Sequence, residues 1–238
     1  MNVDLHLHSC LSPCGDPQMR PEELVGFSLL NGVELIALTD HNSVRNCPAA
    51  SAAAAAYGIG FIPGAEVTSS EDVHCVCLFP ELDAAMFFGA ALEAHSARIQ
   101  NRPDIFGNQT IVHPGDEPDE EYPWLLLPAT DLSILELPAF VRQFGGLCYP
   151  AHVDRDANGL FAMLGTWPEE FLPHAVEIRH RLPDGVPASL PVIQASDAHR
   201  LEDLPEGGFQ LPLASPTTSL TGLRRASPAP GALRRCWT

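Results

Sequence analysis

The chain has 238 residues, of which 45% are apolar and 18% charged, and it carries 30 acidic residues against 13 arginines and no lysine. This apolar content excludes an intrinsically disordered protein, and no run approaches the roughly 18 uncharged apolar residues that a membrane-spanning helix needs. A net charge of −17 repels long polyanions and disfavours duplex binding. The N-terminal sequence lacks the basic start and apolar run of a secretory signal, so we expect a cytoplasmic protein with reduced cysteines.

Short apolar runs alternate with longer helical ones along the chain. The patterns predict strands over residues 3–8, 33–39, 59–66, 73–79, 147–151, 175–178 and 191–195. They predict helices over residues 21–31, 49–57, 84–99 and 132–144. Gly32 and Gly58 follow the first two helices, as is common at helix C-termini. Such alternation is typical of an α/β protein with a parallel sheet or barrel.

Two regions fall outside this alternation. Residues 102–130 begin with a segment rich in Pro, Gly, Asp and Glu, which we interpret as an irregular surface excursion that could cover a site. Residues 224–238 carry Pro, Ala and four arginines, and we expect a mobile tail. The remainder, residues 1–223, shows no internal repeat or domain boundary, so the sequence predicts a single domain.

Two histidines lie two positions apart in the first predicted strand, in the sequence Asp4-Leu5-His6-Leu7-His8-Ser9. Residues two apart on a strand face the same side, so the imidazoles of His6 and His8 point together and can hold one divalent ion. Taken alone, the pattern fits equally well two half-buried histidines with local hydrogen bonds.

Further strand ends carry His, Asp or Glu. The segments are Thr39-Asp40-His41-Asn42, Gly64-Ala65-Glu66, the strand that begins near His74, Pro150-Ala151-His152 and Ser196-Asp197-Ala198-His199. The carboxyl ends of strands in an α/β barrel meet on one face, where active sites are built. This recurrence favours a metal site over scattered structural histidines. Mixed imidazole and carboxylate ligands suit zinc, manganese or iron, and we expect Asp40 to orient a neighbouring ligand.

In chain order, the motifs HLHS, TDHN, GAE with a histidine eight residues later, PAHVDR and SDAH resemble the polymerase and histidinol phosphatase (PHP) family. The resemblance extends from residue 4 to residue 199 and is to the short, stand-alone members. It implies a distorted (β/α)7 TIM-like barrel in a single domain. It also implies that the C-terminal face of this barrel holds two or three divalent ions (Zn, Mn or Fe) and hydrolyses phosphate esters.

Residue by residue, the resemblance implies three metal positions. The first would be held by His6, His8, Glu66 and Asp197, the second by Glu66, His74 and His152 with Glu66 bridging, and the third by His41 and His199. The chain departs from the family shortly after the HxH motif, where a further ligand of the third ion is expected. Cys14 and Asp16 are both candidates there, and a Cys14 thiolate would favour zinc or iron.

Negative charge that develops on a phosphoryl group needs cations besides the metal ions. Arg155, three residues after His152, is the first candidate for binding phosphate, because an arginine can hold two phosphate oxygens in a fork. A surface ion pair with Asp154 or Asp156 explains Arg155 equally well. Arg200, beside His199, and Arg45, after the TDHN motif, are weaker candidates.

The sequence and the resemblance together predict a metal-dependent phosphoesterase with Glu66, Asp197 and His199 in catalysis. A metal-activated hydroxide would attack a small phosphate ester, either a phosphomonoester or a nucleotide or nucleoside bisphosphate, or a short oligonucleotide. Two alternatives are a metal-binding regulatory module without turnover and a hydrolase of amides or lactones. The absence of lysine argues against the latter, because amidohydrolases that begin with HxH commonly bridge their ions with a carboxylated lysine. We expect no long nucleic acid and no membrane as partners.

Overall fold

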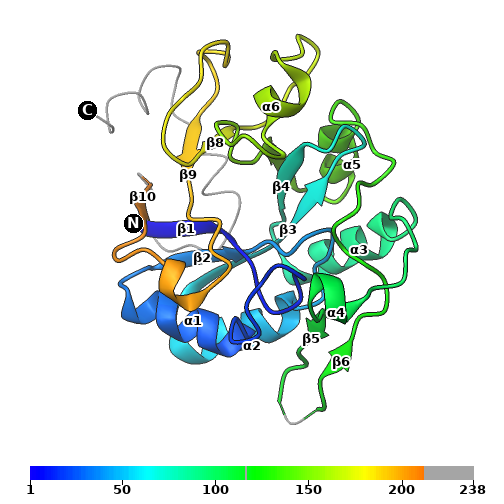
Figure 1. Cartoon of the computed structure of the whole chain (residues 1–238). Coiled ribbons are helices and arrows are strands. Elements are labelled where there is room, and N and C mark those ends of the chain that lie inside the picture. The colour runs from blue at the N-terminus through cyan, green and yellow to red at the C-terminus, as the bar shows by residue number, and fades with distance from the viewer. Residues whose placement is uncertain (116, 212–238) are drawn as a thin grey trace.

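A computed structural model describes residues 1–115 and 117–211, and its centre is a curved six-stranded sheet in the order β10-β1-β2-β3-β4-β7 (Figure 1). The strands are β1 (Asn2–Leu7), β2 (Leu35–Leu38), β3 (Gly60–Thr68), β4 (His74–Leu78), β7 (Leu147–Pro150) and β10 (Phe209–Gln210). A second, parallel pair, β8 (Val176–Ile178) and β9 (Val192–Gln194), lies beside β7. A single parallel bridge between Leu7 and Ala198 then returns the chain to β1.

The predicted α/β class and the position of every predicted strand are confirmed, but the strand directions differ from an all-parallel barrel. β1, β2 and β3 run parallel, whereas β4 is antiparallel to both β3 and β7. The reason is that a turn of a few residues joins β3 to β4, and a parallel partner would need a long crossover. Among the described residues the hydrogen-bonded ladder also breaks between β7 and β8, so the sheet is a curved half-barrel rather than a closed seven-stranded one.

Four longer helices cover the outside of the sheet. They are α1 (Pro21–Leu30), α2 (Cys47–Tyr57), α3 (Leu82–Leu92) and α5 (Leu137–Gln143), and the shorter elements are α4 (Pro103–Phe106), α6 (Leu160–Leu164) and the 3-10 turn Leu201–Asp203. The helix predicted over 84–99 was too long, because beyond Leu92 the carbonyls of His95 and Ile99 accept hydrogen bonds from Asp131 and Leu125. The helix predicted from 132 begins five residues later, after a turn in which the Ser133 amide donates to the Glu136 carboxylate and the Glu136 amide donates to Ser133 Oγ.

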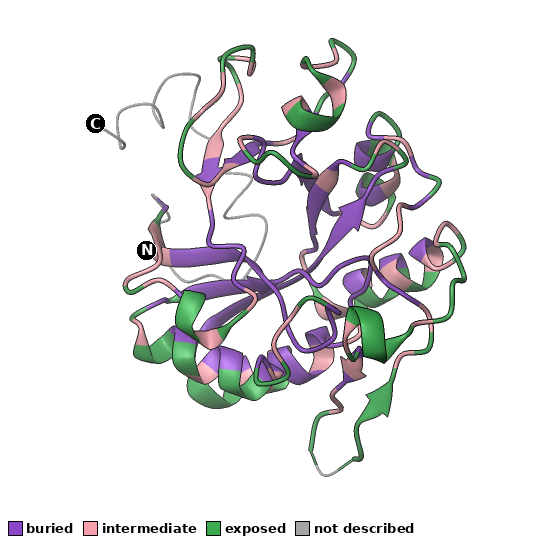
Figure 2. Ribbon diagram, viewed as in Figure 1, coloured by how far each residue is buried: buried purple, intermediate pink, exposed green. Residues whose placement is uncertain are grey.

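Two apolar clusters hold the sheet in place. The larger one lies where the helices contact the sheet and includes Leu24, Ala50, Phe88 and Val141. The other is built almost wholly from strand residues of both sheets, which places it on the inner side of the curve. Figure 2 shows these buried strands surrounded by helices and loops whose outer faces are exposed. The polar cluster described below therefore lies next to buried apolar clusters of the sheet.

The predicted excursion over 102–130 contains α4 and a two-stranded hairpin, β5 (Thr110–Ile111) and β6 (Glu120–Glu121). About half of its described residues are exposed (Figure 2), but its base is anchored. The side chain of Gln109, which has no exposed surface, donates to the carbonyls of Tyr122 and Trp124 and accepts from the Leu126 amide. The side chain of Asn46 bonds Thr110 and Val112. These bonds attach the base of the excursion to the start of α2.

Two predictions concern residues near the C-terminus that the structure does not describe. The mobile tail predicted for residues 224–238, and the end of the predicted domain at residue 223, lie outside the described residues. None of the helices within 1–115 and 117–211 has the length and apolar character needed to cross a membrane.

The packing of β3 against β4 predicts the effect of a methyl group at Gly64. A Cβ there would lie 2.6 Å from the Cys77 carbonyl oxygen and 2.9 Å from the Leu78 side chain. Gly64→Ala should therefore lower the free energy of unfolding by about 1–3 kcal/mol in a urea titration. The matched control is Gly26→Ala inside α1, where the new Cβ would be 3.7 Å from the Tyr57 ring, and it should stabilise the protein by roughly 0.5–1 kcal/mol. Equal effects of the two substitutions would contradict this packing.

Candidate metal centre

Side chains from six segments meet at one edge of the sheet. They come from β1 and the residue just after it (His6, His8), from the ends of β2 and β3 (His41, Glu66), from the start of β4 (His74), and from the loops after β7 and β9 (His152, Asp197, His199). His74 reaches this edge because β4 is reversed, so its first residue lies opposite Thr68 at the end of β3. The topology thus assembles the predicted residues from 6 to 199 in one place.

The carboxylate of Glu66 is the centre of this cluster. It has no exposed surface and lies within 3.4 Å of five imidazoles. Its Oε1 is 3.0 Å from His74 Nδ1, 3.0 Å from His152 Nε2 and 3.3 Å from His6 Nε2, and its Oε2 is 2.9 Å from His41 Nδ1 and 3.4 Å from His8 Nε2. A carboxylate with both oxygens so surrounded can bridge two ions.

The donor atoms of His6, His8, Glu66 and Asp197 have the spacing of ligands to one ion. His6 Nε2 and His8 Nε2 are 3.1 Å apart, and each lies 3.2–3.4 Å from Asp197 Oδ1 and 3.3–3.4 Å from a Glu66 oxygen. Two ligands bound at about 2.1 Å from one ion are separated by roughly 3.0–3.4 Å for octahedral or tetrahedral angles. These four buried residues therefore fit a divalent metal ion.

Unpaired nitrogens support the same interpretation. His41 Nδ1 and His74 Nδ1 lie beside Glu66 at contact distance, yet neither makes a hydrogen bond within the described chain. Buried imidazole nitrogens are rarely left in this way unless another group uses them. The centre has the chemistry of a divalent metal site, with imidazole and carboxylate donors.

Two more sets of mutually close donors lie beside the first. One combines His41, Glu66 and His74, and the other combines His8, His41 and His199. The predicted partner of the second position, His152, also contacts Glu66 Oε1. His41 consequently stands between the positions that the resemblance assigns to the second and third ions.

The charges in the cluster balance one another in the absence of a metal. Burial alone would raise the pKa of the Glu66 carboxyl, but the imidazoles around it, His74 foremost, hold that pKa well below its usual value. Burial would lower the pKa of His8, yet hydrogen bonds to Asp197 and Glu66 raise it to about 9. The charge of Glu66 raises the pKa of His41 to about 9 in the same way. The metal-free centre therefore holds protons that a bound ion must displace.

Asp40, which we expected to orient a ligand, does so through a serine. Its Oδ1 accepts from Ser12 Oγ at 2.7 Å, and its Oδ2 accepts from Ser9 Oγ at 2.6 Å. Because the single hydroxyl proton of Ser12 goes to Asp40, Ser12 Oγ accepts from His8 Nδ1 at 2.9 Å. Once the ring has lost its second proton, His8 therefore presents the lone pair of Nε2 to the cluster.

Sequence analysis missed Glu177, which is buried in β8. Both its carboxylate oxygens lie 3.0–3.1 Å from His6 Nδ1, and Oε1 also accepts from the His152 backbone amide at 3.0 Å. The available signal was an acidic residue inside the apolar run Ala175-Val176-Glu177-Ile178.

Two of the predicted ligands have an unusual backbone conformation. His152 and Asp197 have positive φ angles of 27° and 51°, a backbone state that clusters at functional sites.

The predicted arginines have different environments. Arg155 Nη1 lies 2.5 Å from Asp197 Oδ2, at the rim of the cluster, and Arg179, which the sequence analysis missed, lies 3.5 Å from the same oxygen. Arg200 is exposed and faces Glu202 at 3.8 Å. Only the first two of these three reach the cluster.

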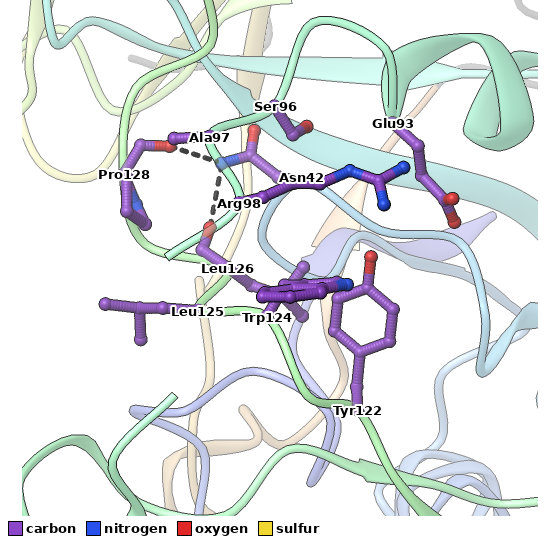
Figure 3. A pocket seen from close by; sticks show the side chains of 10 residues that line it. All are labelled: Asn42, Glu93, Ser96, Ala97, Arg98, Tyr122, Trp124, Leu125, Leu126 and Pro128. Atoms are coloured by element: carbon purple, nitrogen blue, oxygen red, sulfur yellow. Dashed lines mark hydrogen bonds between the residues drawn. The ribbon is translucent and has the colours of Figure 1, made fainter. Parts of the chain in front are cut away.

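Arg45 points away from the cluster, into a cleft of about 210 Å³. There it pairs with Glu93 and lies over the Tyr122 ring at 5.0 Å. Figure 3 shows the adjoining pocket, where Arg98 extends over Trp124 and the Asn42 amide bonds the Leu126 and Pro128 carbonyls. Arg45 thus attaches the excursion to α3.

Of the two candidates for the third position, Cys14 is exposed, and its thiol helps to raise the pKa of the His41 imidazole. It is absent from the mutually close donor sets found in the described chain. Asp16 uses Oδ1 to accept from the Gln18 amide at 2.8 Å. The Asp16 amide donates to the His199 carbonyl at 2.9 Å, so both candidates lie close to residues that the resemblance assigns to the third position.

Comparison with known families bears on this geometry. The family model described as the PHP domain matches residues 4–124, half of the chain. The chain belongs to the PHP family. A curated PHP relative, the 3',5'-nucleoside bisphosphate phosphatase of Chromobacterium violaceum, is 40% identical over 75 residues, which are 32% of this chain and 25% of the relative. The match therefore spans a quarter of that protein's length.

Solved structures share the fold. The lesion-specific endonuclease Q of Pyrococcus furiosus superposes with a TM-score of 0.63 at 19% identity, over 84% of this chain and 48% of that one. An amidohydrolase from Chromobacterium violaceum gives a TM-score of 0.57 at 20% identity, over 99% and 100% of the two chains. A Bifidobacterium adolescentis protein, provisionally described as a metal-dependent phosphoesterase, gives 0.53 at 18% identity, over 94% of each. At these identities the likeness shows the PHP fold alone.

The protonated imidazoles predict how metal binding depends on pH. With pKa values of about 9, His8 and His41 are charged at neutral pH and must lose their protons to bind an ion. Zinc affinity should therefore rise by at least roughly tenfold per pH unit between about pH 6.5 and 8.5, with net proton release. Competition with a chromophoric chelator gives the affinities, and calorimetry in buffers of different ionisation enthalpy counts the protons. An affinity that does not change with pH would contradict these charge states.

Proposed function

We propose that this PHP protein is a metal-dependent phosphoesterase that hydrolyses a small phosphate ester. The observation that carries the proposal is the four-donor set of His6, His8, Glu66 and Asp197, spaced as ligands of one ion, with Glu66 also contacting further imidazoles. A carboxylate shared between two ions is the arrangement that multinuclear hydrolases use.

The assignment of ligands follows the contacts. The first ion would be bound by the four-donor set. The second would be bound by Glu66, His74 and His152, and His41 is close enough to contribute. His41 and His199 serve the third, with Cys14 or Asp16 as the candidate additional ligand. Zinc, manganese and iron suit these donors. Such ions, when bound, supply a water that is ionised near neutral pH and positive charge for the departing oxygen.

The residues of the chain hold the reacting groups in place. Glu66 and Asp197 keep their charges because imidazoles surround them, so both offer anionic ligands across the working pH range. Burial and the charge of His8 lower the pKa of His199 to about 3. Burial, the larger of the two causes, does not depend on the His8 proton that a bound ion displaces. A neutral imidazole ligates but has no proton to give, so we assign His199 to metal binding rather than to protonation of the leaving group.

A phosphate would meet Arg155 and Arg179 at the rim. Their side chains are 45% and 34% exposed, so an anion can reach both guanidinium groups, and each can donate in a fork. Arg200 lies further out, where it can add charge but makes no contact with the cluster.

The relatives support a phosphate ester as the substrate class. The curated relative, which is 40% identical over 75 residues, is a nucleoside bisphosphate phosphatase. The net charge of −17 favours a small ester over a long nucleic acid. The active form would be reconstituted with zinc, manganese or iron and screened against phosphomonoesters, nucleoside bisphosphates and dinucleotides.

Loss of the bridging carboxylate should abolish turnover. Glu66→Gln should lower phosphate release by at least roughly 100-fold, because the amide neither carries the charge nor bridges two ions. The control is Glu169→Gln, on the exposed surface, which should keep full activity. Metal content per chain, measured by mass spectrometry, should fall in the first variant only. If the metal-loaded wild type releases no phosphate from any ester while retaining bound metal, the regulatory-module alternative replaces this proposal.

Removal of the rim arginine should weaken the productive binding of phosphate. Arg155→Ala should lower kcat/KM by roughly 10- to 100-fold, since hydrogen bonds to charged groups contribute about 1.5–3 kcal/mol. Arg155→Lys should recover part of the loss, because it keeps the charge without the fork. Arg102→Ala is the control, as Arg102 pairs with Asp104 on the excursion and should have no effect. An unchanged kcat/KM for Arg155→Ala would remove this residue from the site.

A further inference from the structure

Glu177 is a buried acidic residue that the ligand assignment leaves unused. It has no exposed surface, and its only ion-pair partner within the described chain is His6. A buried carboxylate is costly unless hydrogen bonds satisfy it. The partners of Glu177 are therefore central to its role, and both belong to the metal centre.

The first partner is the imidazole of His6. Glu177 Oε1 and Oε2 lie 3.0 and 3.1 Å from His6 Nδ1. A carboxylate accepts, so Nδ1 carries the donated proton and Nε2 faces the cluster as the ligand atom. His6 Nε2 is the atom that lies 3.1 Å from His8 Nε2 and 3.4 Å from Asp197 Oδ1. Glu177 thus sets the ring orientation at the first metal position.

The second partner is the backbone at His152. The same Oε1 accepts from the His152 amide at 3.0 Å, and the Glu177 carbonyl accepts from the Val153 amide at 3.0 Å. His152 needs this support, because its φ of 27° is a backbone state that residues with side chains rarely adopt. Held in this way, its ring places Nε2 at 3.0 Å from Glu66 Oε1. Glu177 therefore also sets the second metal position.

We propose that Glu177 is a positioning residue that couples the two metal positions sharing Glu66. One oxygen, Oε1, accepts from a ligand of the first position and from the backbone of a ligand of the second. A displacement of this oxygen toward one partner alters its distance to the other. Occupation of one position, which fixes His6 or His152, thus preorganises the other, and the two ions bind with positive cooperativity. This inference rests on the metal site of the proposed function.

Ser12 provides the matched comparison. It accepts from His8 Nδ1, as Glu177 does from His6, but its remaining contacts are with Asp40 and the His41 amide rather than with His152. Both side chains therefore orient a histidine of the first position, and of the two only Glu177 contacts His152.

The test is a zinc titration of the full chain that resolves two binding constants. Glu177→Gln should lower both affinities by roughly 10- to 100-fold and remove the cooperativity. Glu177→Asp keeps the charge, but its shorter side chain moves the carboxylate oxygens away from both partners. It should therefore also lower both affinities and remove the cooperativity. Ser12→Ala should lower the affinity of the first position but leave the cooperativity between the two positions intact, because Ser12 does not contact His152. Glu169→Gln should change neither.

Several results would overturn the proposal. One is a lower melting temperature of Glu177→Gln or Glu177→Asp with unchanged affinities, which would make Glu177 a structural residue only. Another is a loss of zinc affinity at one metal position alone, which would show that Glu177 does not couple the two positions. Wild-type binding of two ions without cooperativity would do the same. The proposed function fails separately, if the wild type binds both ions but hydrolyses no ester, because the titration requires no substrate.

Discussion

The burial of one carboxylate among five imidazoles is the constraint on which this structure depends. Glu66 has no contact with solvent, and without compensation its charged form would cost several kcal/mol. The compensating nitrogens come from segments that are distant in the sequence, so the centre exists only when the whole sheet has formed. The imidazoles around Glu66 lower its pKa, and its charge in turn helps to raise the pKa values of His6, His8 and His41. A divalent ion can replace the protons on these imidazoles with little change in local charge. The same cluster is therefore compatible with a metal-free and a metal-bound state.

Strand direction decides which residues can join that cluster. His74 is the first residue of β4, and in an all-parallel barrel the first residue of a strand lies at the face opposite the site. It reaches Glu66 because the turn after Thr68 reverses the chain, with Asp72 at a φ of 60° and its amide bonded to the Ser69 carbonyl. A short turn, rather than the strand pattern, therefore delivers a candidate ligand. The reversed direction of β4 is therefore part of how the site is built and not a departure that the site has to tolerate.

Local patterns predicted the strands and the convergence of the histidines, because apolar runs and strand-end motifs are properties of short segments. Properties that depend on tertiary pairing were not predictable in this way. The helix expected over 84–99 ends at Leu92 because remote amides bind the carbonyls that would continue it. Arg45 lies four residues after His41 in the sequence, but its side chain lies over the Tyr122 ring. Proximity in sequence does not determine the direction of a side chain. Glu177 and Arg179 belong to β8 and the loop after it, and they reach the site through strand pairing that their own sequence does not encode.

Asp197 connects the metal cluster to the anion-binding rim. Its Oδ1 faces His6 and His8, while its Oδ2 is 2.5 Å from Arg155 Nη1 and 3.5 Å from Arg179 Nη1. In a chain of net charge −17, two converging arginines are a local exception, and Asp197 satisfies them when no other anion is present. A cation at the inner oxygen withdraws negative charge from the outer one and so weakens its attraction for both guanidinium groups. We therefore expect occupation of the metal position to free the arginines for a phosphate, so that one carboxylate orders the assembly of metal and substrate.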